Sequence, residues 1–334
     1  MAKLRVGMIG LGMGAGHHAR SLKDLSDEIE CVAGYSPTAA RREAFTEKYG
    51  LPVTADLDGM FADPSIDAIM IITPPNTHLE LVRRAASAGK HILLEKPLDI
   101  TLERSEAIVE TARNAGVTLG VVLQNRFRPG ILALAEAVAS GRLGEIVEAS
   151  AAIRNWRPQS YYDEPGRGTK ARDGGGVLLT QGIHTIDLLL SLAGTPKEVA
   201  SFVRTSPIHR METEDLVTAT FTYANGAIGT LNATTCAYPG LPDRIELIGT
   251  KGTAVFSGNR LEAAFMDGTT LKKGEDETGS GSGADPMAFG HGLHRALIAD
   301  FASAIRGNRP PKVTGEDALK AHRFIEAILR ASKS

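Results

Sequence analysis

The sequence predicts an α/β protein with two domains: an N-terminal doubly wound parallel sheet and a C-terminal α+β domain with a large open mixed or antiparallel sheet. The chain has 334 residues, more than the ~100–200 residues of one ordinary domain. In the first third, short apolar segments alternate with helical ones, which is typical of a parallel sheet. After about Gln124, strand-like segments follow one another with few long helices between them. We therefore expect domains at residues 1–124 and 125–334.

The first domain alternates strands and helices in order. Its strands are short and apolar, as expected for a sheet that is covered on both faces, and glycine or proline ends most of the elements. The expected strands are Leu4–Ile9, Ile29–Gly34, Ala68–Ile72, His91–Leu94 and Val117–Leu123. The expected helices are Ala15–Leu25, Thr38–Lys48, Thr77–Ala88 and Leu102–Asn114.

The second domain is richer in strands. A strong hairpin signal, Ala224-Asn225-Gly226, separates two of them, and the Gly- and Ser-rich segment Lys273–Gly292 predicts a long mobile loop. The expected strands are Ile146–Ile153, Val199–Arg204, Leu216–Tyr223, Ala227–Thr234, Asp243–Ile248 and Thr253–Phe256. The expected helices are Gly176–Leu192, His294–Ile305 and Glu316–Ala331, of which the C-terminal one is expected to pack back on the first domain.

Composition excludes several classes of protein. Hydrophobic residues make up 43% and charged residues 23%, with a formal net charge of −2, so neither disorder nor a nucleic-acid or anionic-membrane partner is indicated. The apolar runs are far shorter than the ~20 residues that span a bilayer, and the N-terminus lacks a signal-peptide pattern. With only two cysteines, Cys31 and Cys236, we expect a reducing, cytoplasmic location and no disulfide framework. We also expect no metal site, because His291 and His294 have no acidic or cysteine partner at ligand spacing.

A glycine-rich turn follows the first expected strand directly. Gly10, Gly12 and Ala15 match the pattern G-x-G-x-x-A, with Met13 and Gly14 inside the turn. Such a turn lets the backbone approach a pyrophosphate at a helix N-terminus. The strand–turn–helix context favours a dinucleotide-binding Rossmann domain over a glycine-rich turn without a ligand.

The residues at the end of the second strand bear on whether the cofactor is NAD or NADP. They read Tyr35-Ser36-Pro37-Thr38 and include no acid to hold the ribose 2′-hydroxyl of NAD. Ser36 and Thr38 can donate hydrogen bonds to a 2′-phosphate, and Arg41 with Arg42 can neutralise it. This favours NADP over NAD; the alternative is that both arginines lie on a solvated helix face.

Three motifs together resemble the Gfo/Idh/MocA family of sugar and cyclitol oxidoreductases. They are the glycine turn, Thr73–His78 with Glu95-Lys96-Pro97, and Asp173–Asp187, and they occur in the order that the family shows. The resemblance implies a nicotinamide cofactor beside the Glu-Lys-Pro turn, a cis peptide before Pro97, and a catalytic histidine on the downstream helix. Further cofactor contacts are expected from Thr73, Pro74, Asn76, His78, Glu95, Lys96 and Gln124.

Lys96 and His184 are the candidate catalytic residues. Lys96 follows a parallel strand, at the sheet edge where ligands bind, and its ammonium can stabilise a developing negative charge on the reacting oxygen. An imidazole with an ordinary pKa near 6.5 suits proton transfer at neutral pH. The alternatives are a surface lysine and a satisfied core histidine.

Two residues near His184 bear on the proton path. On one helix, Thr180, His184 and Asp187 would share a face. Inositol-dehydrogenase-like relatives carry an Asp four residues before the histidine; here Thr180 stands there, and it cannot take up a proton at neutral pH. Asp187 either orients His184 or belongs to a buried network.

Aromatic and basic residues before this helix form a candidate substrate site. Aromatic rings stack on sugar faces, and guanidinium groups pair with carboxylate or phosphate. The candidate substrate residues are Arg126, Trp156, Arg157, Tyr161, Tyr162, Arg167, Thr180 and Asp187. Arg157 and Arg167 favour an anionic substrate, and the segment around Arg167-Gly168-Thr169 is similar to members that act on nucleotide-activated amino-sugar acids, although Gly166 departs from their pattern. The alternative is interface packing with surface charge.

These observations predict an NAD(P)-dependent oxidoreductase. Hydride would pass between nicotinamide and a secondary hydroxyl or ketone of a sugar, cyclitol or nucleotide-sugar. Two alternatives are a non-catalytic NAD(P)-binding sensor and a redox-assisted glycosidase on the same fold. A broad sheet face in the second domain favours a homodimer or homotetramer.

Overall fold

The protein is described here from a computed structural model, which covers residues 2–274 and 289–332. The chain divides into two compact units. The first contains the residues up to Gln124 together with Gly290–Leu319, and the second contains Asn125–Phe289 and the residues from Lys320 onward. The chain thus leaves the first unit near residue 124 and returns to it with one later segment.

The first unit is built on a six-stranded parallel sheet in the order β3-β2-β1-β4-β5-β6. This order confirms the predicted doubly wound parallel sheet. Its central strand β4 is fully buried, and β1 is buried except at Arg5, because helices lie on both faces. The strands are β1 (Leu4–Ile9), β2 (Ile29–Tyr35), β3 (Val53–Thr54), β4 (Ala68–Ile71), β5 (His91–Leu94) and β6 (Leu119–Val121).

Helices connect the strands of the first unit. Side-chain caps begin two of them: Asp56 accepts from the Gly59 amide and Thr101 from the Arg104 amide. The helices are α1 (Ala15–Asp24), α2 (Ala39–Tyr49), α3 (Leu57–Ala62), the 3₁₀ turn η1 (Pro75–Thr77), α4 (His78–Ser87), α5 (Leu102–Asn114) and α11 (Gly292–Arg306), which packs on α1. Helix α12 (Gly315–Arg330) begins in the first unit and ends in the second. The short elements α3 and β3 carry too little periodicity to be predicted.

The second unit is built on an eight-stranded sheet in the order β14-β13-β12-β11-β7-β10-β9-β8. Strands β7 and β10 run parallel, and the other neighbours are antiparallel, so the predicted mixed sheet is confirmed, as is the hairpin at Gly226. The strands are β7 (Ile146–Arg154), β8 (Glu198–Arg204), β9 (Leu216–Thr222), β10 (Ile228–Thr234), β11 (Arg244–Gly249), β12 (Gly252–Ser257), β13 (Arg260–Phe265) and β14 (Thr270–Lys273).

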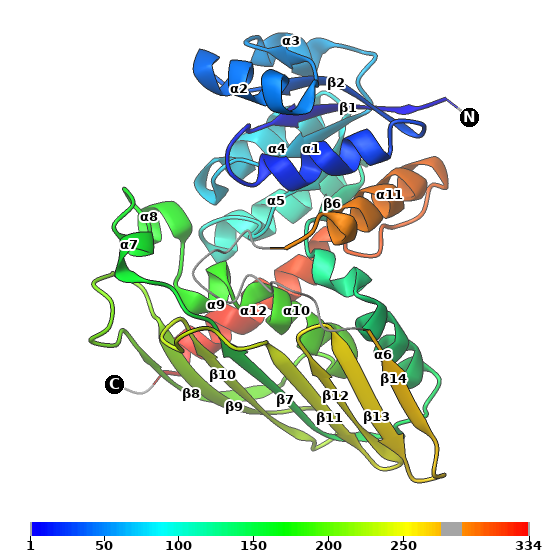
Figure 1. Cartoon of the computed structure of the whole chain (residues 1–334), viewed down its shortest axis with the longest axis vertical. Coiled ribbons are helices and arrows are strands. Elements are labelled where there is room, and N and C mark those ends of the chain that lie inside the picture. The colour runs from blue at the N-terminus through cyan, green and yellow to red at the C-terminus, as the bar shows by residue number, and fades with distance from the viewer. Residues whose placement is uncertain (1, 275–288, 333–334) are drawn as a thin grey trace. The chain divides into compact units, whose positions relative to one another are not determined.

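Helices cover one face of this sheet, and among the described residues no helix covers the other (Figure 1). Along β9 buried and exposed side chains alternate, with Val217, Ala219 and Phe221 inward. On the open face, Phe202 is 58% exposed and Ile228 59%. The helical elements of this unit are η2 (Gln124–Phe127), α6 (Pro129–Ala139), α7 (Gln159–Tyr162), α8 (Lys170–Asp173), α9 (Val177–Thr180) and α10 (Ile183–Ala193).

The single helix predicted over Gly176–Leu192 is wrong. The chain forms α9 and α10 instead, and the segments Lys170–Thr180 and Ile183–Ala193 are bent by 51° relative to each other. The Gly182 amide donates to the Val177 oxygen (2.7 Å), which lies five residues back, and a Cβ at Gly182 would approach that oxygen to 3.0 Å. Thr180 and Asp187 therefore do not share the face of one continuous helix.

Two further findings concern the long loop and membrane spans. The ends of the predicted loop Lys273–Gly292 belong to regular elements, because Lys273 is the last residue of β14 and Gly292 is the first residue of α11. Residues 275–288 of this loop lie outside the described residues. Within the described residues, no single helix is long and apolar enough to cross a membrane, although the bent pair around Gly182 passes the test of length and composition.

Candidate functional site

The glycine turn at the end of β1 is shaped as a phosphate cradle. Gly10 has a φ of 104°, and a Cβ there would lie 2.6 Å from the Ile72 oxygen, so only glycine fits. A Cβ at Gly12 would meet nothing within 4 Å, which leaves space above the backbone. Gly14 stands at the N-terminus of α1, and Met13 is 60% exposed. Open backbone at a helix N-terminus is what a pyrophosphate requires, so these residues fit a dinucleotide.

The end of β2 carries the residues expected to distinguish NAD from NADP. Ser36 is buried, and its hydroxyl oxygen accepts from the Thr38 amide (3.3 Å). Arg42 donates to the Ser36 carbonyl (2.6 Å), whereas Arg41 and Thr38 are exposed. The two arginines therefore differ: Arg42 is anchored to the strand end, and Arg41 projects from the first turn of α2.

The loop after β4 is tied to the loop after β5 by His78. This ring is fully buried and lies between the Thr73 oxygen at 2.9 Å and the Pro97 and Leu98 oxygens at 3.1 and 3.0 Å. Burial lowers the pKa of His78. His78 therefore braces two strand ends, and the exposed residues Pro74 and Asn76 with the half-buried Thr73 form the surface of this loop.

The Glu95-Lys96-Pro97 turn follows β5 and has the expected cis peptide between Lys96 and Pro97. Glu95 accepts hydrogen bonds from His18 Nε2 (2.7 Å) and from the Lys96 amide (3.1 Å). Burial alone would raise its pKa, but the hydrogen bond and nearby positive charge lower the pKa of Glu95 to about 2. Lys96 is half-buried. It follows this ionised carboxylate in the chain and lies at the carboxyl edge of the sheet.

Histidines gather around Glu95, which the sequence did not predict. The rings of His17 and His294 stack at 5.1 Å between centroids, and His18 meets His294 edge-on at 5.2 Å. Burial lowers the pKa of His294 to about 3 and, with Arg20, that of His17 to about 4. Donor atoms of His18, Glu95 and His294 lie within 4.8 Å of one another, so a metal ion could replace the hydrogen bond between His18 and Glu95. The histidine pair near the start of α1 was the available sequence signal.

In the second unit, His184 lies in the first turn of α10 and is half-buried. Three residues later, Asp187 is held by Arg126 through two hydrogen bonds of 2.8 and 2.6 Å. Asp187 is 1% and Arg126 13% exposed in their side chains. The carboxylate therefore belongs to a buried network that ties α10 to η2. The Thr180 hydroxyl donates to the Gly176 oxygen (2.6 Å), which ties it to the backbone of α9.

The predicted aromatic and basic cluster exists, but it is partly internal. Arg157 is 3% exposed and Tyr162 8%, and the Tyr162 hydroxyl donates to Thr235 Oγ1 (3.0 Å); burial raises the pKa of this tyrosine. Arg167 lies over the Tyr161 ring at 4.6 Å. The half-buried members, Trp156, Tyr161 and Arg167, are the ones that retain surface for a ligand.

Another unpredicted network supports this cluster from behind. His209 is completely buried between Asp215 Oδ2 (2.7 Å) and the Arg157 oxygen (2.8 Å). Ser206 donates to the same carboxylate (2.7 Å), and Cys236 Sγ lies 3.3 Å from it. Donor atoms of His209, Asp215 and Cys236 also have a spacing that could hold a metal, but both histidine nitrogens already have partners. The network fixes the Arg157 backbone.

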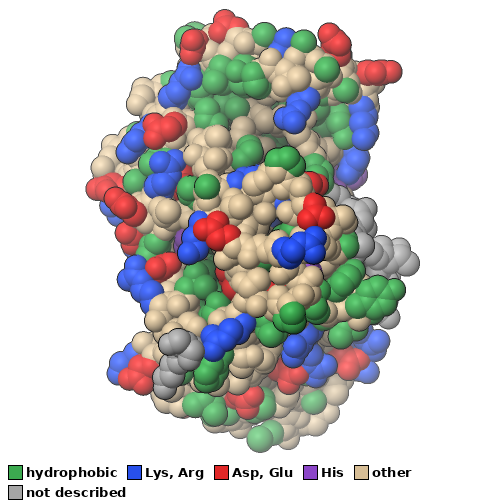
Figure 2. All heavy atoms as spheres, turned by 90° about the vertical axis from the view of Figure 1, so that its left-hand side faces the viewer, with side chains coloured by type: hydrophobic (Ala, Val, Ile, Leu, Met, Phe, Trp, Pro, Cys, Tyr) green, Lys and Arg blue, Asp and Glu red, His purple; other side chains and the backbone are tan. Residues whose placement is uncertain are grey.

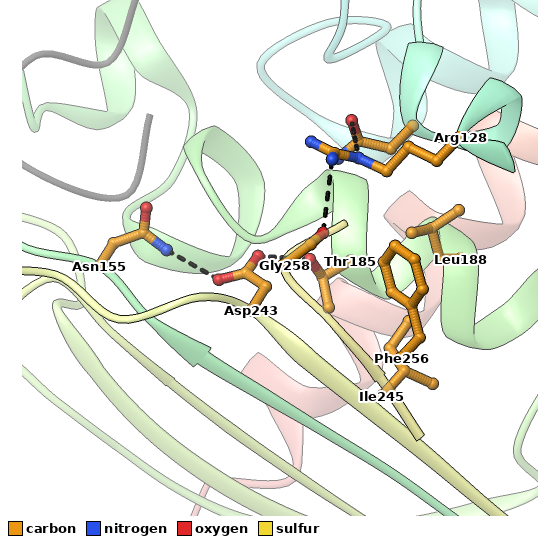
Figure 3. A pocket seen from close by; sticks show the side chains of 9 residues that line it. Arg128, Asn155, Thr185, Leu188, Asp243, Ile245, Phe256 and Gly258 are labelled. Carbon is orange, nitrogen blue, oxygen red and sulfur yellow. Dashed lines mark hydrogen bonds between the residues drawn. The ribbon is translucent and has the colours of Figure 1, made fainter. Parts of the chain in front are cut away.

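A cavity of about 60 Å³ lies between α10 and the sheet of the second unit (Figure 3). Asp243, just before β11, accepts hydrogen bonds from Thr185 Oγ1 and from Asn155 Nδ2 (3.2 Å). Burial raises the pKa of Asp243 to about 6. Of the lining residues, Asn155 belongs to the predicted aromatic and basic cluster, and Asn125 was expected within reach of the cofactor or substrate. Asp243, Thr185 and Arg128 were not predicted, because scattered single polar residues give no motif. The lining residues are Asn125, Arg128, Asn155, Thr185, Leu188, Asp243, Ile245, Phe256 and Gly258.

Comparisons with known proteins decide the family. Residues 4–123 match the model of an oxidoreductase family with an NAD-binding Rossmann fold, and residues 131–255 match the GFO/IDH/MocA C-terminal domain. Inositol 2-dehydrogenase of Rhizobium meliloti is 30% identical, with 98% of this chain and 96% of the relative covered. The chain belongs to the Gfo/Idh/MocA family. The predicted resemblance is thereby confirmed, and this protein is an oxidoreductase with an NAD-binding domain.

Other members of the Gfo/Idh/MocA family show the same similarity over the whole chain. The 1,5-anhydro-D-fructose reductase of Ensifer adhaerens is 30% identical, with coverage of 91% of this chain and 89% of the relative. The WlbA dehydrogenase of Bordetella pertussis, solved in complex with NADH and UDP-GlcNAcA, is 28% identical, with a TM-score of 0.84 and coverage of 99% and 97%. In this Gfo/Idh/MocA protein, the phosphate cradle therefore belongs to the NAD-binding domain.

Proposed function

We propose that the protein is an NAD(P)-dependent dehydrogenase or reductase that acts on a secondary hydroxyl or ketone of a sugar, cyclitol or nucleotide-sugar. Lys96 carries this proposal. It lies at the same carboxyl edge of the parallel sheet as the glycine cradle, since β1 pairs with β4 and β4 with β5. Ligands bind at this edge in doubly wound sheets. The relatives named as an inositol dehydrogenase and an anhydrofructose reductase support the substrate class.

The bound nicotinamide would supply hydride acceptance or donation. Gly10, Gly12, Met13 and Gly14 would hold the pyrophosphate, and residues after β2, β4 and β5 the rest of the dinucleotide. His184 would accept the hydroxyl proton at an imidazole nitrogen. The Lys96 ammonium would donate a hydrogen bond to the same oxygen and stabilise its negative charge. Glu95 keeps a negative charge beside Lys96.

The absence of an acid at the end of β2 supports a preference for NADP. Arg41 is exposed in the first turn of α2, and Arg42 is anchored beside Ser36, so a 2′-phosphate would meet two positive charges. The Bordetella relative was solved with NADH, so both cofactors belong in any assay.

The open sheet face and the two thiols support proposals about assembly and location. Phe202, Leu216 and Ile228 are 58%, 42% and 59% exposed, and we infer that a second copy of the chain covers them in a homodimer or homotetramer. Cys31 and Cys236 are both free thiols, which supports a reducing compartment, the cytoplasm.

On the face shown in Figure 2, acidic and basic side chains are interspersed.

A cofactor-coupled substrate screen tests the proposed function. Inositols, hexopyranoses, anhydrosugars and nucleotide-sugar acids are each assayed with both oxidised and both reduced cofactors, following absorbance of the reduced nicotinamide. The proposal predicts turnover with at least one polyhydroxylated substrate. Cofactor binding without any turnover would favour a sensor, and product release without net cofactor change would favour a redox-assisted glycosidase.

A further inference from the structure

The cavity beside Asp243 is not explained by the functions assigned above. We propose that this cavity is a specificity subsite that takes a hydroxymethyl arm of the substrate, with the Asp243 carboxylate accepting the hydrogen bond of its hydroxyl. The inference rests on the proposed dehydrogenase function and names its substrate class: a pyranose or anhydrosugar that carries a CH₂OH group, in preference to a cyclitol, which has none.

The polar side of the cavity is built to hold a hydroxyl group. Asn155 and Thr185 are 6% and 2% exposed, and both direct side-chain hydrogen bonds to Asp243 (Figure 3). A carboxylate has about four lone-pair positions, so it can accept from a ligand hydroxyl as well. Asp243 itself is only partly buried, which leaves it within reach of a ligand.

Arg128 adds a positive charge on another side of the cavity. Its guanidinium donates to Asn125 Oδ1 (3.2 Å), to the Gly258 oxygen (3.3 Å) and to Asn259 Oδ1 (3.1 Å). These bonds fix the guanidinium, and its charge favours the ionised form of Asp243. A hydroxyl, which both donates and accepts, suits such a pair of opposite charges better than a second anion does.

The size and the apolar wall admit a single-carbon arm. A volume of about 60 Å³ is several times the ~10–15 Å³ that a cavity needs to hold one water, which is room for a CH₂OH group. Leu188, Ile245 and Phe256 form the apolar wall, against which a methylene carbon can pack.

The cavity is also next to the proposed base along α10. Thr185 lines the cavity and directly follows His184, and consecutive Cα atoms are about 3.8 Å apart. Because neighbouring side chains on a helix point in different directions, the cavity lies beside the turn of α10 that carries His184, and we place the ring attached to the arm at that turn. The subsite would raise the rate with arm-bearing substrates by orienting the reacting carbon.

Matched substrate pairs test this inference. For the wild-type protein, kcat/KM is measured with the best substrate of the screen and with the analogue that lacks only the hydroxymethyl group, for instance a hexopyranose and its pentopyranose. We expect a ratio of at least about tenfold in favour of the arm. In Asp243→Asn this ratio should fall about tenfold, while kcat/KM for the arm-less analogue stays within about threefold.

Controls separate recognition from a structural role. Asp267→Asn removes an exposed carboxylate of the same unit, and it should leave the ratio unchanged; thermal unfolding verifies that each variant is folded. A wild type that prefers inositols, or an Asp243→Asn variant that slows both substrates equally, would overturn the subsite and assign Asp243 to positioning α10 alone. If no substrate of any class is turned over, the proposed function itself fails.

Discussion

Glu95 and Asp243 are both carboxyl groups with hydrogen-bonding neighbours, yet their pKa values move in opposite directions. At Glu95, the bond from His18 and nearby positive charge outweigh burial, and the pKa falls to about 2. At Asp243, burial outweighs the bonds from Thr185 and Asn155, and the pKa rises to about 6. Glu95 is thus a fixed charge beside Lys96, whereas Asp243 changes its charge near neutral pH.

Replacing Glu95 should cost stability in a pH-dependent way. A carboxyl whose pKa is lowered by folding stabilises the protein above its unfolded value, about 4.5, and loses that contribution as the pH falls towards 2. Glu95→Gln should therefore lower the free energy of unfolding by about 2 kcal/mol at pH 7, with a smaller loss at pH 3. Urea unfolding at both pH values measures this, with the exposed Glu103→Gln as control. An equal loss at both pH values would contradict the charge argument.

Arg41 should distinguish the two cofactors. Arg41→Ala removes an exposed charge next to the proposed 2′-phosphate site, so we expect about tenfold weaker binding of NADPH and little change for NADH. Fluorescence titration gives both dissociation constants, and Lys48→Ala, at the far end of α2, is the matched control. Tighter binding of NADH than of NADPH by the wild type would refute the preference for NADP.

At the scale of elements, the sequence predicted most strands and helices to within one or two residues, because their apolar periodicity and glycine or proline ends are local signals. It missed α6, β13 and β14 as well as the short elements β3, α3, α7 and α8, and it joined α9 and α10 into one helix. Apolar periodicity continues through Gly182, whereas the 51° bend depends on a backbone bond and on close packing of Gly182. Such long-range geometry leaves no local pattern.

The ion pair between Arg126 and Asp187 should hold α10 in place. Asp187 is buried and the Arg126 side chain is only 13% exposed. Because removal of the arginine leaves the buried carboxylate without its ion-pair partner, Arg126→Met should destabilise the protein by about 3–5 kcal/mol. The double variant Arg126→Met, Asp187→Leu should recover a large part of this loss. Urea unfolding of both single variants and the double variant forms the cycle; a coupling below about 1 kcal/mol would mean that the pair does not anchor the helix.

At the scale of the whole molecule, the sequence predicted the two kinds of sheet and the family, but not which site residues are internal. Six residues that were expected to contact ligands are buried in the structure: Ser36, His78, Gln124, Arg157, Tyr162 and Asp187. A residue type in a motif indicates chemistry, whereas burial depends on residues far along the chain: Tyr162 bonds to Thr235, and His209 to the Arg157 backbone. The Asp243 cavity escaped prediction for the same reason.

The open sheet face gives a prediction about assembly. A charge placed in the proposed interface would be desolvated on association, so Phe202→Glu should convert the oligomer to monomers at micromolar concentration. Light scattering coupled to size exclusion measures the mass. Met266→Glu, at an apolar residue that is 79% exposed after β13, is the control. A wild type that is monomeric would contradict the proposed interface.

The measurement that tests the central claim most directly is kcat of Lys96→Met and His184→Asn with the best substrate of the screen. If these residues stabilise the reacting oxygen and move its proton, each variant should lose about 10²–10⁴-fold in kcat, while the cofactor dissociation constant of His184→Asn changes by less than about threefold. A kcat within about threefold of the wild type for either variant would contradict the account.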